Sequence, residues 1–235
     1  MQPADPIADY GAAIARELCF DAKLARRVRA EVEDHLQEWL ATSGDAGPHE
    51  AQESAIRAFG HPSELARAFV PGALASLARR AAALVALAVI GIFVVMDARV
   101  VWYGWMQWHP GEQLRAANAI ALPADRLAFV LAFILSLAAL LYAMTRRAPT
   151  RSHASFGREI RRCIRLGAAT LAALSVAVAI ELVLTGIRFA ETALDGSVII
   201  PTLSLTAEAS VAVGCIAYLW ISARRVSLAL RLAGE

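Results

Sequence analysis

The pattern of apolar positions changes at about residue 70 of this chain. Before that point, apolar residues recur every three or four positions among charged ones, which is the spacing of amphipathic helices. Beyond it, long apolar blocks alternate with short segments rich in arginine. The pattern predicts an all-α protein in which an N-terminal helical bundle precedes a four-helix transmembrane bundle.

The polar front end, residues 1–72, is expected to form a domain of short helices. Its longest helix begins after Asp21, ends near Thr42 and carries an apolar stripe that is expected to build a small core, at Leu24, Val28, Val32, Leu36, Trp39 and Leu40. Pro48 and Pro62 suit the first turns of two more helices, and an earlier helix covers about 7–18. A domain of roughly 70 residues is marginally stable alone, so we expect it to dock on a partner or on a membrane.

The remaining residues, 73–235, are expected to form the transmembrane domain. Hydrophobic residues make up 58% of the chain, above the roughly half that is typical of soluble domains. Four apolar blocks approach or reach the ~20 residues that cross a bilayer. They predict spans at approximately 81–103, 127–144, 166–187 and 200–222.

Arginines predict the orientation of these spans. They are concentrated before the first span, between the second and third, and after the fourth, at Arg79, Arg80, Arg146, Arg147, Arg151, Arg158, Arg161, Arg162, Arg165, Arg224, Arg225 and Arg231. The other two connections hold fewer. Since positively charged loops stay in the cytoplasm, both termini are expected there. The first ten residues also lack the basic and apolar regions of a signal peptide.

A sequence pattern in the front end resembles a known family. It combines an acidic helix containing Asp34, His35 and Leu36 with a Phe59-Gly60 pair and a helix opened by Pro62. Over roughly residues 8–70 this pattern resembles the HAAS-type domain, and it is similar to the prefix segment that precedes some bacterial permeases. The chain is expected to depart from the permeases, because its sequence predicts neither an ATPase nor a large extracytoplasmic domain.

The resemblance implies a cytoplasmic interaction domain on a small protein of the bacterial inner membrane. Such proteins are commonly encoded beside PadR-like winged-helix repressors, and they are thought to relay an envelope signal to that regulator. A PadR-like regulator is therefore the implied cytoplasmic partner. The lipid bilayer and a second copy of this chain are further candidate partners.

The acidic helix also raises the question of an active site. Glu31, His35 and Glu38 share one helix face, but a metal site generally takes ligands from several elements. We therefore predict no metal, no cofactor and no catalytic residue. Two interpretations of Asp34 and His35 stay open. They either stabilise the fold through hydrogen bonds to a neighbouring loop, or they contact a partner.

Charged residues inside the predicted spans form the other candidate site. Asp97, Arg99, Glu181 and Glu208 fall within or beside apolar blocks, where ionisable groups are costly and usually face the bundle interior. At about 1.5 Å rise per residue, Glu181 and Glu208 both lie roughly 21–23 Å from the cytoplasmic ends of their spans. We expect a polar layer of these residues, which either joins the helices, senses protons, or binds a cation or small ligand.

The leading functional hypothesis is non-enzymatic. A membrane-anchored signalling protein would bind a regulator through its front domain, under the control of the transmembrane bundle. A transporter, or a transporter subunit, that uses the intramembrane carboxylates is the alternative, and a small membrane enzyme is a third class. The basic stretch 146–165 lacks a recognition-helix motif, so direct nucleic-acid binding is not expected.

Overall fold

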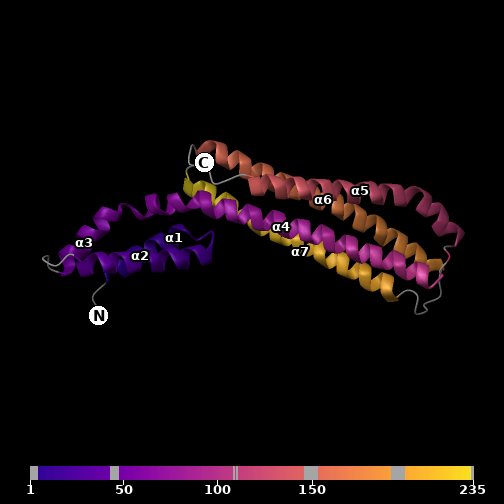
Figure 1. Ribbon diagram of the computed structural model, residues 1–235, viewed down its shortest axis with the longest axis horizontal. Coiled ribbons are helices and arrows are strands. Elements are labelled where there is room, and N and C mark those ends of the chain that lie inside the picture. Colours follow the sequence, from indigo (N-terminus) through magenta and orange to yellow (C-terminus); the bar gives the residue numbers. More distant parts are fainter. Residues whose placement is uncertain are drawn as a thin grey trace. The chain divides into compact units, whose positions relative to one another are not determined.

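The computed structural model describes residues 5–42, 48–107, 109, 111–145, 153–191 and 199–233. Seven helices account for nearly all of them, and the described residues form no strand (Figure 1). The helices are α1 (Pro6–Glu17), α2 (Ala22–Thr42), α3 (Pro48–Phe59), α4 (Pro62–Trp105), α5 (Glu112–Thr145), α6 (His153–Glu191) and α7 (Ile199–Ala233). The all-α prediction is confirmed.

Contacts between residues divide the chain into two compact units. Unit 1 comprises the described parts of 1–76, 148–160 and 223–235, and unit 2 those of 77–147 and 161–222. Unit 1 thus includes the front end together with the start of α6 and the end of α7, which the sequence analysis had grouped with the transmembrane domain. Helices α4, α6 and α7 each contribute residues to both units.

Helices α1 to α3 of unit 1 pack around a small apolar core. Asp5 and Asp21 cap α1 and α2, because their carboxylates accept hydrogen bonds from backbone N–H groups of the first turns. The expected stripe of α2 is buried from Leu24 to Leu36. Trp39, however, is 40% exposed, so its placement in the core was wrong. Helix α1 has 12 residues and α2 has 21, so the last turns of α2 extend beyond α1.

A hydrogen bond ties α1 to the turn between α3 and α4. The Tyr10 hydroxyl donates to the backbone carbonyl of Gly60 at 3.0 Å. Gly60 has a φ of 84°, a left-handed conformation that ends α3 and that glycine adopts most readily. His61 then begins the next helix, because its Nδ1 accepts from the Ser63 backbone N–H at 3.3 Å. Phe59 and Pro62 are half-buried on either side of this turn.

The four long helices extend further than the apolar blocks predicted. Instead of a short helix followed by a separate span, α4 is one helix of 44 residues that continues past Pro71. Helices α5 and α6 begin well before the spans expected at 127 and 166, since the polar flanking residues continue each helix. By length and composition, α4, α5, α6 and α7 can each cross a membrane, and the chain is accordingly a membrane protein.

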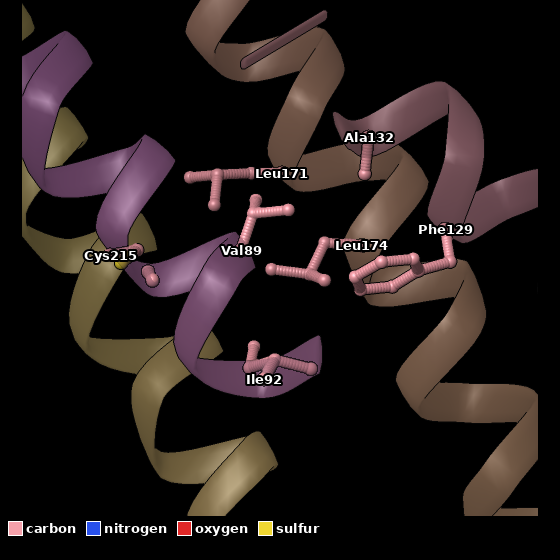
Figure 2. Packing of buried hydrophobic residues seen from close by; sticks show 8 residues of the cluster. Val89, Ile92, Phe129, Ala132, Leu171, Leu174 and Cys215 are labelled. Atoms are coloured by element: carbon pink, nitrogen blue, oxygen red, sulfur yellow. The ribbon is translucent and has the colours of Figure 1, made fainter. Parts of the chain in front are cut away.

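Within unit 2, the four long helices share one apolar core. Figure 2 shows its labelled members, which are Val89 and Ile92 of α4, Phe129 and Ala132 of α5, Leu171 and Leu174 of α6, and Cys215 of α7. Other large apolar side chains of these helices are exposed, among them Leu87, Leu127, Val183 and Trp220. An apolar core inside an apolar outer surface suits a bundle surrounded by lipid.

Candidate functional site

Three helices of unit 2 bring oppositely charged side chains together in the interior. Arg99 of α4 lies between Glu181 of α6 and Glu208 of α7, with its Nη1 atom 3.2 Å from Glu181 Oε1 and 3.4 Å from Glu208 Oε1. All three residues are at most 5% exposed. A single guanidinium therefore bridges two carboxylates that come from different helices.

A second arginine, Arg188, completes the surroundings of Glu181. Its Nη1 atom donates to Glu181 Oε1 at 2.5 Å and to Thr185 Oγ1 at 3.2 Å. Its guanidinium carbon also lies 5.3 Å from the centre of the Tyr103 ring of α4, within the range of a cation–π interaction. Glu181 thus has two cationic partners.

Arg188 was expected in the loop that follows the third span and not in this site. Helix α6 continues to Glu191, so Arg188 lies seven residues after Glu181 on the same helix face. If the third helix had been continued past its apolar block, the spacing of seven residues would have identified Glu181 and Arg188 as a pair.

Glu208 has fewer partners than Glu181. Its Oε1 atom accepts a hydrogen bond from Ser204 Oγ, one turn earlier in α7, at 2.8 Å, and it faces Arg99. Its side chain is almost entirely removed from the surface of the bundle. Arg99 is consequently the one cationic group that forms an ion pair with Glu208 among the described residues.

A third buried carboxylate, Asp125 of α5, was also missed. It is 4% exposed, and the charges of Arg99, Glu181 and Glu208 act on it. The second span was expected to begin at 127 because the apolar block starts there, whereas α5 begins at Glu112 and places Asp125 inside the helix. We call Arg99, Asp125, Glu181, Arg188 and Glu208 the charged cluster.

Asp97 does not join the charged cluster. It is exposed on α4 and has no ion pair with another residue of the described part. Residues two apart on a helix point about 160° apart around its axis, so Asp97 and Arg99 cannot both face the bundle interior. The polar layer therefore contains Arg99, Glu181 and Glu208 of the expected four residues, and Asp125 and Arg188 in addition.

The charged cluster is suited to holding charge inside an apolar bundle. It contains three carboxylates and two guanidinium groups that come from all four long helices. No three His, Cys, Asp or Glu side chains of the described residues are grouped as metal ligands. Because buried charges need partners, any change in the pairing alters how the four helices are held together.

The second candidate site is the exposed face of α2 in unit 1. Asp34 and His35 are both exposed, and His35 Nδ1 lies 3.8 Å from Glu38 Oε2, which is also exposed. No hydrogen bond joins Asp34 or His35 to a loop among the described residues. Their side chains are thus open to solvent, whereas the next residue in the chain, Leu36, is fully buried.

The chain matches no family model, no curated protein and no solved structure.

Proposed function

We propose that this protein is a membrane-anchored regulatory protein. Unit 1 binds a cytoplasmic partner, a PadR-like transcriptional regulator, and the transmembrane bundle controls that binding. One observation carries the proposal. Asp34 and His35 project into solvent from a helix whose apolar side is buried in a folded unit. The resemblance to the HAAS-type domain, which these residues help to define, supports a regulator as the partner.

The shared helices support control by the bundle. Helix α4 holds Arg99, and α7 holds Glu208, and both helices also contribute residues to unit 1. In unit 1, Arg67 Nε of α4 donates to the Leu232 carbonyl of α7 at 3.0 Å. A change in the Arg99–Glu208 pair therefore acts on the same two helices that this hydrogen bond joins.

We place the protein in the bacterial cytoplasmic membrane, with both termini in the cytoplasm. The arginine distribution supports this orientation. The composition of unit 1 agrees with it, since one compact unit gathers described parts of the N-terminal region, the start of α6 and the end of α7. Arg158, Arg224, Arg225 and Arg231 of the arginine-rich segments lie in this unit, and a common unit requires a common side of the membrane.

The mechanism that we propose is non-enzymatic sequestration. The regulator is held at the membrane by unit 1 until the pairing within the charged cluster changes. The transmembrane helices then rearrange, unit 1 releases or captures the regulator, and transcription changes.

A binding measurement with the purified regulator tests the proposal. The full chain in lipid nanodiscs is mixed with the PadR-like regulator of the same genome, and binding is measured by light scattering or by surface plasmon resonance. We expect specific binding that the double substitution Asp34→Asn, His35→Ala weakens at least tenfold. The substitution Asp9→Asn, at an exposed carboxylate of α1, is the matched control and should leave binding unchanged. Absence of binding by the wild-type chain would refute the proposed function.

The charged cluster also supports a second candidate function, the transport of protons or cations. Carboxylates buried between transmembrane helices are typical of such pathways. Reconstituted vesicles that contain a pH-sensitive dye distinguish the two functions. A regulatory protein leaves an imposed pH gradient intact, whereas a transporter dissipates it at a rate that falls in Glu208→Gln.

A further inference from the structure

The charged cluster has an unequal number of buried positive and negative groups. Arg99 and Arg188 carry the positive charges, while Asp125, Glu181 and Glu208 carry the negative ones when ionised. Four of the five have an ion pair inside the cluster. Asp125 is the exception, and the cluster as a whole has one negative charge in excess.

Arginines lie near Asp125, but none of them forms an ion pair with it among the described residues. Arg99 of α4 bridges Glu208 of α7 and Glu181 of α6, and Arg188 is hydrogen-bonded to Glu181. The remaining nearby charge belongs to Arg126, which follows Asp125 in α5 and is exposed. Both buried guanidinium groups are therefore engaged elsewhere.

The Asp125 side chain itself lacks a partner. Its Oδ1 atom is buried, and no hydrogen bond joins it to any residue of the described part. A buried carboxylate without a hydrogen bond or an ion pair is so costly that it takes up a positive charge instead of staying ionised. The orphaned oxygen and the charge imbalance are separate observations that indicate the same kind of ligand.

We propose that Asp125 is a binding site for a single proton inside the transmembrane bundle. When the proton is bound, the five groups of the charged cluster sum to zero charge. When the O–H bond breaks, the proton leaves to water and the electron pair stays on the Asp125 carboxylate, so the cluster carries one negative charge. That new charge competes with Glu181 and Glu208 for Arg99, the bridge between α4, α6 and α7.

A proton fits this site better than a metal cation does. A hard cation such as Ca²⁺ takes six or more oxygen ligands. The other carboxylates of the charged cluster, Glu181 and Glu208, already face guanidinium groups within 3.4 Å through their Oε1 atoms. A proton needs only the one oxygen that is free, Oδ1 of Asp125.

This inference rests on the proposed function in one respect: it names a proton as the input that the charged cluster detects. Its test needs no partner protein. Failure of the test therefore leaves the binding of a regulator by unit 1 undecided, and failure of that binding leaves the proton site intact.

Infrared spectroscopy of the full chain in lipid vesicles tests the proposal. A protonated carboxylic acid has a carbonyl stretching band that is separate from the carboxylate bands. We expect this band at mildly acidic pH, and we expect it to disappear when the pH is raised. Asp125→Asn should abolish the band, and Asp97→Asn, at an exposed carboxylate of α4, should leave it unchanged. A wild-type chain without the band, or a band that persists in Asp125→Asn, would overturn the proposal.

Two further measurements keep the test independent of how the variant folds. Aspartate labelled with ¹³C at the side-chain carboxyl should shift the band of the wild-type chain, whereas labelled glutamate should not, and the opposite result would place the proton elsewhere. Replacement of choline chloride by sodium or potassium chloride at constant pH should leave the band in place. Its loss in either salt would show that the site takes an alkali cation instead of a proton.

Discussion

Removal of Arg99 should destabilise the transmembrane bundle more than any other single change in the charged cluster. Arg99→Met keeps much of the length of the side chain and removes its charge. Glu181 would still be bound by Arg188, but Glu208 would keep only the hydrogen bond from Ser204. Glu208 is 2% exposed, so water cannot replace the lost partner.

The magnitude follows from the burial of these groups. Removal of one partner of a buried ion pair costs about 3–5 kcal/mol, because it leaves an uncompensated charge. Glu208→Gln in the same chain removes that charge, so the double variant should be more stable than the sum of the two single effects predicts. We expect a coupling free energy between Arg99 and Glu208 of roughly 1–3 kcal/mol. The coupling between Arg99 and Glu181 should be smaller, because Arg188 remains beside Glu181.

Reversible unfolding of the full chain in mixed detergent micelles measures these free energies. The single variants are Arg99→Met, Glu208→Gln and Glu181→Gln. Together with the wild-type chain and the two double variants that combine Arg99→Met with either glutamate change, they form two double-mutant cycles. Asp97→Asn serves as the control and should change the free energy of unfolding by less than about 0.5 kcal/mol. A coupling of zero between Arg99 and Glu208, or an equal effect of Asp97→Asn, would refute the arrangement of the cluster.

Three predictions concern unit 1, and hydrogen exchange of the α1–α3 amides in the full chain checks each of them. Tyr10→Phe removes the donor to the Gly60 carbonyl and should lower the opening free energy by about 1 kcal/mol; unchanged exchange would contradict the contact. Gly60→Ala forces an L residue into a positive φ and should lower the opening free energy by roughly 1–2 kcal/mol. Gly72→Ala is its control and should not lower it, because the added methyl group would have no atom within 4 Å. Leu36→Ala should cost about 2–5 kcal/mol because Leu36 is fully buried, and Trp39→Ala should cost clearly less; equal costs would place Trp39 in the core.

The helices of unit 1 were predictable because local signals agree with each other. Asp21 precedes an apolar stripe, and Gly60 and Pro62 mark the end of one helix and the start of the next. Trp39 was misplaced because periodicity identifies a helix face but does not show how far the neighbouring helix extends along it. The length of α1, which decides that question, belongs to another part of the chain.

The charged cluster was predictable in part for a different reason. The depths of Glu181 and Glu208 follow from counting residues along each span, and both side chains meet Arg99. The same count of residues also placed Asp97 in the polar layer, although its side chain is exposed. Asp125 was missed because an apolar window ends where charged residues begin, whereas the helix continues past them.

Control of unit 1 by the charged cluster is tested most directly by the affinity of the full chain for the PadR-like regulator. The wild-type chain and the double variant Glu181→Gln, Glu208→Gln are compared in the same lipid nanodiscs, after size-exclusion chromatography has shown that both are folded. We expect the dissociation constant to change at least tenfold, which corresponds to about 1.4 kcal/mol. Equal affinities for the two chains would contradict any control of partner binding by the charged cluster.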